Sequence, residues 1–155
     1  MARELWLLRH GEAEPHDARP DAERRLTPRG ERQSRDAGAA LAKLGVELAA
    51  AYTSPRVRAR DTARLACESL GVEPEVAEAL SGGWDAAGAR DLLAGHDDGD
   101  AVLVVGHEPD LSQVVLDLVG ARIDLKKGGV AAVRVDGSAE LLVLLRPQDT
   151  EAIAL

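Results

Sequence analysis

The stretch LWLLRHG, residues 5–11, joins four apolar residues to an arginine, a histidine and a glycine. The apolar run predicts a short β-strand. Its polar end, Arg9-His10-Gly11, allows two interpretations. Either the strand simply reaches the surface and turns there, or its end carries chemistry, and the rest of the chain decides between them.

Two helices are predicted farther along the chain, over residues 26–45 and 54–71. In each, a hydroxyl-bearing residue that can cap the first turn precedes a proline, and a glycine ends the helix. These residues are Thr27, Pro28 and Gly45 in the first helix, and Ser54, Pro55 and Gly71 in the second.

Strands and helices alternate along the rest of the chain. The predicted segments are a strand over 46–54, a short segment over 72–80, a weak helix over 84–95, a strand over 101–106, a helix over 109–120, and two strands within 129–145 around Asp136-Gly137. The run AVLVVG at 101–106 is uninterrupted and apolar, as expected for a strand covered on both faces. This alternation predicts the α/β class, as a three-layer αβα sandwich with a mostly parallel sheet. The Asp-Gly turn predicts a final hairpin that adds an antiparallel edge.

Composition and charge limit the class of protein. A chain of 155 residues suits a single domain over residues 1–155. Aromatic residues make up only 2%, so the core is expected to consist of Leu, Val and Ala. The formal net charge of −8 argues against a nucleic-acid partner and against an anionic membrane surface. The chain shows no signal-peptide pattern and no apolar stretch of about 20 residues, so the cytoplasm is the expected location.

Metal and disulfide chemistry find little support in the sequence. Cys67 is the only cysteine, so no disulfide can form within the chain, and we expect it to be a small core residue. The polar run HDDGD at 96–100 predicts a solvated turn, because it lacks the ligand spacing of a metal loop. His16 and His96 each stand alone and are expected on the surface. The sequence therefore predicts no metal and no other cofactor.

Polar and basic residues follow three of the predicted strands. These groups are Arg9-His10-Gly11 after the first strand, Ser54 with Arg56, Arg58 and Arg60 after the second, and His107-Glu108 after the run at 101–106. Ligands of open parallel sheets bind at the carboxyl ends of the strands, so these groups are expected to share one crevice. Its positive charge, together with the N-terminus of the helix that begins near Ser54, would suit a phosphate. Helix positions two apart point in different directions, so Arg56 and Arg60 are expected on the solvated surface.

Four motifs, in their order and spacing, resemble the histidine phosphatase superfamily, which is also called phosphoglycerate mutase-like. They are LLRHGEAEP at 7–15, LTPRGERQS at 26–34, YTSPRVRARDTA at 52–63 and VLVVGHEPDLS at 102–112. Within this superfamily, the short chain is similar to the SixA-type phosphohistidine phosphatases. The resemblance covers residues 4 to about 120 and implies a phosphoglycerate mutase-like fold.

The resemblance implies roles for the residues in these motifs. His10 would be the nucleophile, a neutral imidazole that attacks phosphorus and becomes phosphohistidine. Arg9, Arg58 and His107 would hold the phosphoryl oxygens, where charge spreads in the transition state. Gly11 would let the backbone turn and approach the phosphate. No metal is required in this scheme.

A proton for the leaving group is the least defined part of the implied site. The resemblance points to Glu78, within EVAEALSGGW at 75–84, as a general acid. Glu12, Glu73 and Glu75 are alternatives. A phosphohistidine substrate would relax this demand, because imidazole has a pKa of about 6.5 and leaves readily once protonated.

Three functions remain open from the sequence. They are a phosphatase acting on a phosphorylated protein that carries phosphohistidine, a phosphomonoesterase acting on a small phosphate ester, and a phosphate-binding module without turnover. The last is disfavoured, because a pure binder does not need a nucleophilic imidazole. Mutase activity is not expected, since the stretch EAEPHDARP at 12–20 lacks the asparagine that a mutase carries after RHG. The sequence leaves the oligomeric state open.

Overall fold

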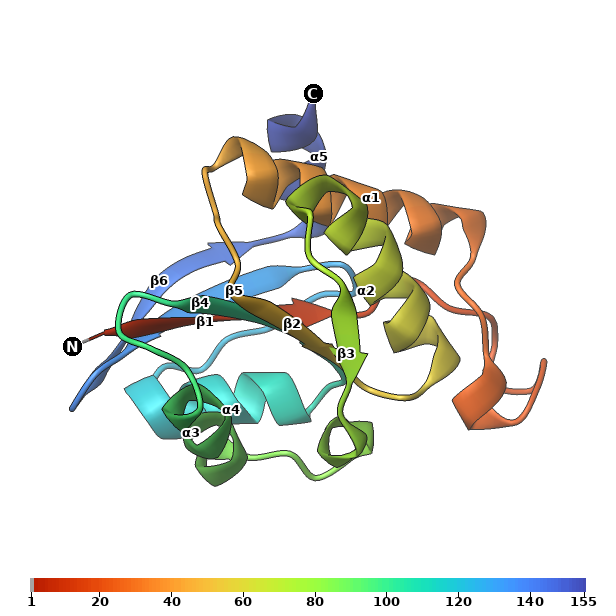
Figure 1. Ribbon diagram of the computed structural model, residues 1–155. Coiled ribbons are helices and arrows are strands. Elements are labelled where there is room, and N and C mark those ends of the chain that lie inside the picture. The colour runs from red at the N-terminus through yellow and green to blue at the C-terminus, as the bar shows by residue number, and fades with distance from the viewer. Residues whose placement is uncertain (1) are drawn as a thin grey trace.

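A sheet of six strands lies between two layers of helices in the computed structural model, which describes residues 2–155 (Figure 1). The strands are β1 (Arg3–Arg9), β2 (Ala50–Thr53), β3 (Pro74–Val76), β4 (Ala101–Gly106), β5 (Val130–Val135) and β6 (Ala139–Leu145). The helices are α1 (Pro28–Lys43), α2 (Val57–Leu70), α3 (Ala86–Ala94), α4 (Asp110–Val119) and α5 (Pro147–Ala154), with 3-10 turns η1 (Asp21–Glu23) and η2 (Glu78–Ser81). None of the helices within residues 2–155 is long and apolar enough to cross a membrane.

The strand order is β3-β2-β4-β1-β5-β6. Three pairs are parallel: β1 with β4, β4 with β2, and β2 with β3. Two pairs are antiparallel: β1 with β5, and β5 with β6. The prediction of a mostly parallel sheet with an antiparallel edge is therefore confirmed. Arg9 pairs with Gly106 and Thr53 pairs with Val105, so β1, β2 and β4 end at the same edge of the sheet. This register brings the residues that follow the three strands together.

Each face of the sheet is covered by its own helices, which completes the predicted three-layer αβα sandwich. Figure 1 shows α1, α2 and α5 on one face and α3 and α4 on the other. Alternate residues of β1 supply both layers: Leu5 and Leu7 belong to the core under α3 and α4, whereas Trp6 and Leu8 belong to the core under α1 and α2. Leu, Val and Ala form most of both cores, as the composition predicts.

The predicted helix signals are confirmed for α1 but only partly for α2. The Thr27 side chain accepts a hydrogen bond from the Gly30 amide at 3.0 Å and caps α1, whose first residue is Pro28. The second helix begins at Val57, so the prediction that Ser54 caps it was wrong. The Ser54 hydroxyl is instead bonded to His107, which belongs to the site described below. The short elements β3 and α5 were not predicted as a strand and a helix.

The predicted degree of burial is confirmed for Cys67 but not for His96. Cys67 is buried as predicted, and burial raises the pKa of its thiol to about 11, so it stays protonated. The prediction that His96 lies on the surface was wrong, because its side chain is mostly buried and its Nε2 lies 2.8 Å from the Tyr52 hydroxyl. His96 precedes β4, whereas Tyr52 belongs to β2, and neither residue lines the cavity described below.

Candidate active site

A cavity of about 260 Å³ lies at the carboxyl ends of β1 and β4. Arg9, His10, Arg58 and His107 all line it, so the structure brings together the four residues expected at a phosphate. The other lining residues are Ala13, His16, Asp21, Arg24, Glu108 and Lys127. The expectation of a local basic pocket on an acidic chain therefore has a defined place in the fold.

Gly11 fixes the path of the chain beside His10. A Cβ atom at Gly11 would lie 2.5 Å from the Gly30 carbonyl oxygen in the first turn of α1. Conversely, a Cβ at Gly30 would lie 2.0 Å from the Glu12 carbonyl oxygen. These distances are far below van der Waals contact, so both glycines are required by the close packing of the two backbones. The Gly11 amide also donates to the buried Thr62 hydroxyl at 3.1 Å, which ties the tripeptide to α2.

The His10 ring is held in one neutral form. Its Nδ1 lies 2.8 Å from the Gly11 carbonyl oxygen. Because a carbonyl oxygen only accepts, Nδ1 carries the proton and Nε2 keeps its lone pair. Burial lowers the pKa of His10 to about 3, although its hydrogen bond to Gly11 acts in the opposite direction. The nearby His107, Arg58 and Arg9 lower the pKa further, so the ring is a neutral base near pH 7.

The His107 ring is oriented through Ser54. The Ser54 hydroxyl oxygen accepts a hydrogen bond from the Arg56 amide at 3.2 Å and lies 2.7 Å from His107 Nε2. Donation of the hydroxyl proton to Nε2 assigns the ring proton to Nδ1. Burial, and then the charge of Arg58, lower the pKa of His107 to about 4. His107 is therefore neutral near pH 7 and presents an N–H donor.

Three buried donors of this site lack a hydrogen-bond partner within residues 2–155: Arg9 Nε, Arg58 Nε and His107 Nδ1. Buried donors are rarely left unpaired, because each unmade hydrogen bond costs about 1–3 kcal/mol. The three belong to the residues that the family resemblance assigns to the phosphoryl oxygens. Unpaired N–H donors beside an imidazole lone pair are the kind of groups that bind an oxyanion.

Asp21 and Arg24 line the cavity, and sequence reasoning missed both. One Asp21 carboxylate oxygen accepts from Arg24 at 3.0 Å and the other accepts from Arg58 at 3.2 Å and from Arg56. Arg58 also donates to the Asp21 backbone carbonyl at 2.7 Å. Burial by itself would raise the pKa of Asp21, but Arg24 and Arg58 outweigh it and lower the pKa to about 2. Asp21 is therefore an anion that orients three arginines.

The three arginines at the start of α2 differ in burial, and one of them differs from the prediction. Arg58 is buried and reaches the cavity, and Arg60 is exposed, as expected. The expectation that Arg56 is solvated was wrong, because its side chain is two-thirds buried. Its Nε donates to the Ser81 carbonyl at 3.0 Å and a terminal nitrogen pairs with Asp21.

Glu78 does not lie in the cavity. It begins η2, is exposed, and is not among the residues that line the space beside His10. Glu73 and Glu75 are also exposed, and Glu12 is paired with Arg29 at 3.3 Å. The described part of the chain also contains no group of three or more His, Cys, Asp or Glu residues that could hold a metal ion.

The mostly parallel sheet brings His10, His107 and Arg9 together at its strand ends, and the first turn of α2 adds Arg58 to the same cavity. Residues 5–82 match the family model described as histidine phosphatase superfamily (branch 1), and the chain belongs to this superfamily. It is a hydrolase with the phosphoglycerate mutase-like fold of that family, and it is SixA-type in its structural likeness.

The individual relatives agree with this placement. The chain is 34% identical to an uncharacterized protein of Picosynechococcus sp. over 89% of this chain and 88% of that one. The structure of the protein histidine phosphatase SixA complexed with tungstate matches with a TM-score of 0.84 at 27% identity, covering 94% of this chain and 97% of that chain. A Nakamurella multipartitia protein assigned as a phosphohistidine phosphatase SixA matches with a TM-score of 0.79 at 26% identity, covering 95% and 97%.

The two buried histidines predict a loss of stability in acid. In the unfolded chain they bind protons near pH 6.5, whereas in the folded protein His10 and His107 bind them only near pH 3 and pH 4. The unfolded state therefore binds more protons between these limits, and the free energy of unfolding falls as the pH drops below about 6.5. Each histidine contributes a slope of up to about 1.4 kcal/mol per pH unit within its range.

Urea unfolding of the parent and of His107→Asn between pH 7 and pH 4.5 measures this effect. The variant is expected to lose stability less steeply with decreasing pH than the parent. His16→Asn is the matched control, because the His16 side chain is exposed and should leave the slope unchanged. Parallel curves for the parent and His107→Asn would contradict a lowered pKa.

Proposed function

We propose that this protein is a metal-independent protein phosphohistidine phosphatase that works through a phosphohistidine on His10. The observation that carries the proposal is the set of three buried, unpartnered donors around a neutral His10. A phosphoryl group in the cavity would place its oxygens on these donors and its phosphorus next to the imidazole lone pair. The tungstate bound by the similar SixA protein supports the same kind of oxyanion ligand.

The first half of the reaction transfers the phosphoryl group to the enzyme. The Nε2 lone pair of His10 attacks phosphorus and forms a P–N bond, while the bond from phosphorus to the substrate imidazole breaks. The electron pair of the broken bond returns to that imidazole, which leaves as a neutral ring because its other nitrogen already carries a proton. Arg9, Arg58 and His107 donate hydrogen bonds to the three equatorial oxygens, whose charge must be stabilised in the transition state. The Nδ1 atom of His10 keeps its proton and donates a hydrogen bond to the Gly11 carbonyl oxygen, which stabilises the positive charge that develops on the ring.

The second half returns His10 to its starting state. A water molecule attacks the phosphohistidine, the P–N bond breaks, and inorganic phosphate leaves. The proton from water passes to the released phosphate, so His10 is again neutral with its lone pair on Nε2. No step of this cycle requires a cation, because the phosphate charge is met by the arginines and His107.

The carboxylates of the cavity favour a phosphohistidine over an alkyl phosphate ester. Among the described lining residues they are Asp21 and Glu108. Asp21 is ionised at neutral pH, and Glu108 accepts hydrogen bonds from the amide and the hydroxyl of Ser112. Neither is arranged to protonate an alkoxide, whereas an imidazole leaving group has a pKa of about 6.5 and needs little assistance. In this scheme Glu78 is dispensable, and we expect Glu78→Gln to retain turnover of a phosphohistidine substrate.

A turnover panel tests the proposed substrate class. One enzyme preparation is assayed with a phosphohistidine-bearing protein, with sugar phosphates and with nucleotides, and the kcat/KM values are compared. The proposal expects the phosphohistidine protein to be hydrolysed most efficiently. A higher kcat/KM on one of the small esters would instead support a phosphomonoesterase acting on a metabolite.

Chelation of divalent metals should leave the activity unchanged. The reason is that Arg9, Arg58 and His107 stabilise the charge on the phosphoryl oxygens by hydrogen bonds, a task that a metal ion performs in other phosphatases. The measurement is turnover of the phosphohistidine protein after prolonged incubation with EDTA and removal of the chelate. Loss of activity that one specific divalent ion restores would contradict the proposed mechanism.

A further inference from the structure

A groove leads from the catalytic cavity toward the space between α1 and α5. The two hollows share Arg9 and Lys127 among their lining residues, so they lie next to each other. The part next to the cavity has a volume of about 450 Å³. We call this part the basic groove; apart from Arg9, its charged residues are Glu12, Arg29, Lys126, Lys127 and Arg146.

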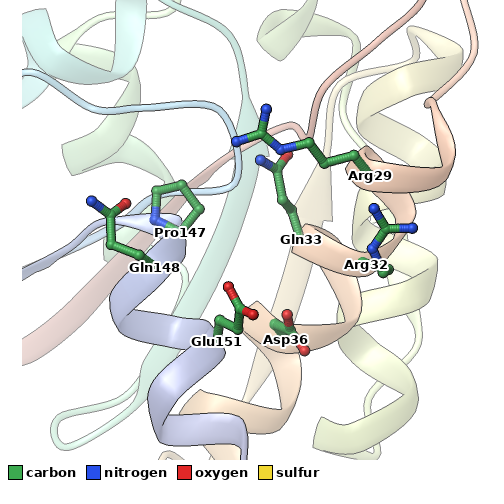
Figure 2. Close-up of a pocket in the computed structure, with 7 residues that line it drawn as sticks. All are labelled: Arg29, Arg32, Gln33, Asp36, Pro147, Gln148 and Glu151. Carbon is green, nitrogen blue, oxygen red and sulfur yellow. The ribbon is translucent and has the colours of Figure 1, made fainter.

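The hollow continues beyond the basic groove, where the charge changes. Figure 2 shows this continuation, with Arg29 and Gln33 on α1 facing Pro147 and Gln148 on α5. These four residues line both parts. At the far end Asp36 and Glu151 lie side by side (Figure 2), and burial together with the Glu151 charge raises the pKa of Asp36. Arg32 also lines this end, so its two carboxylates are balanced by Arg29 and Arg32, whereas the basic groove next to the cavity carries an excess of cations.

Lys127 differs from the other cations of the basic groove in its pairing. Arg9 donates to the Leu125 carbonyl, and each of the remaining cations has an acidic partner within 3.3 Å, in the pairs Arg29 with Glu12, Lys126 with Asp124, and Arg146 with Asp149. Lys127 is exposed and makes no ion pair within residues 2–155. Its ammonium is thus available to an external anion at the junction of cavity and groove.

The backbone of Lys127 is fixed by the catalytic residues themselves. The amide of the next residue, Gly128, donates to the Arg9 and His10 carbonyl oxygens, both at 3.1 Å. Gly128 has a φ of 76°, which a residue with a side chain rarely adopts. On the other side, the Leu125 carbonyl accepts a hydrogen bond from Arg9 at 3.0 Å. The loop therefore holds Lys127 at a set place relative to the phosphate site.

We propose that the basic groove binds acidic side chains of the phosphorylated protein, within a few residues of its phosphohistidine, with Lys127 as the main contact. The proposal rests on the proposed function, because it assumes a protein substrate. A small phosphate ester would occupy the cavity of about 260 Å³ and leave the groove open, whereas a protein segment continues into it. A local positive stretch on a chain of net charge −8 attracts an acidic segment selectively, since the rest of the surface repels it.

Three phosphohistidine peptides of one length test the proposal, with Glu, Ala or Lys at the positions flanking the phosphohistidine. At low salt the parent is expected to hydrolyse the Glu peptide with a kcat/KM roughly tenfold above that of the Ala peptide. Lys127→Glu should remove this preference and favour the Lys peptide, and Lys127→Gln should give an intermediate result. The preference should shrink at about 0.5 M salt, because exposed charges are screened.

Arg122→Glu is the matched control, since Arg122 is an exposed cation of the same loop that does not line the groove. It should keep the preference of the parent. The small ester para-nitrophenyl phosphate should be turned over by Arg122→Glu within about threefold of the parent. For Lys127→Glu the readout is the ratio of kcat/KM between the Glu and Ala peptides, because Lys127 also lines the cavity and its loss changes the rate on every phosphate. Equal rates on the three peptides, in both the parent and Lys127→Glu, would overturn the groove proposal and leave the proposed function standing. If the parent hydrolysed para-nitrophenyl phosphate but none of the peptides, the proposed function itself would fail.

Discussion

His10→Ala is expected to lower turnover by on the order of 10⁴-fold or more, the scale seen when an enzyme loses its covalent nucleophile. The structure gives the physical reason, because the His10 ring is neutral, is fixed through Nδ1 and has its lone pair on Nε2. No other group that lines the described cavity offers the same combination. His107 is the other buried histidine there, and its Nε2 is already bonded to Ser54.

A trapping experiment measures the intermediate directly. The parent is mixed with a substrate labelled in its phosphoryl group and quenched without acid, since phosphohistidine is labile in acid. Label is expected on His10 in the parent and absent from His10→Ala. His16→Ala is the matched control, because His16 lines the same cavity but its side chain is almost fully exposed. Appreciable turnover by a folded His10→Ala protein would rule out the covalent mechanism.

The parts of the site that could be predicted are those placed by regular secondary structure. Parallel strands end at one edge of a sheet, so the residues after β1 and β4 had to meet. That rule brings His10 and His107 together from positions nearly 100 residues apart, with ring centroids 5.2 Å from each other. Arg58 lies in the first turn of α2, and the resemblance to the family's motif, together with the different directions of its neighbours two positions away, selected it.

The residues that could not be predicted lie on irregular backbone or depend on a partner distant in the sequence. Asp21 belongs to a short 3-10 turn between β1 and α1, where no periodicity indicates which side chains point inward. Ser54 has the sequence signature of a helix cap, but its hydroxyl bonds to His107, and α2 begins at Val57 instead. The position of Arg56, two residues before Arg58, predicts a solvated side chain, but its terminal nitrogen pairs with Asp21 and the side chain is partly buried. In each case a tertiary hydrogen bond outweighs the local signal.

Arg58→Ala is expected to lower kcat/KM by on the order of 10²-fold or more, the scale for removing one preorganised donor to a developing oxyanion. Arg58 is 6% exposed, and its Nε is buried without a partner in the described chain. Both terminal nitrogens donate to Asp21, which fixes the plane of the guanidinium and leaves Nε directed elsewhere. Arg58→Lys should recover little of the activity, because an ammonium cannot hold Asp21 and a phosphoryl oxygen in the same geometry.

Inhibition by tungstate separates the loss of phosphate binding from a loss of fold. Arg58→Ala should bind tungstate much more weakly than the parent, whereas Arg60→Ala, the matched control on the exposed side of α2, should match the parent. Arg56→Ala should change kcat/KM only a few-fold, because Arg56 acts on the site through Asp21 and does not line the cavity. If tungstate inhibits Arg58→Ala as tightly as the parent, or if Arg60→Ala is the more damaged enzyme, then Arg58 does not hold the phosphoryl group. The burial of Arg58 would in that case serve only its pairing with Asp21, and the three unpartnered donors would need another explanation.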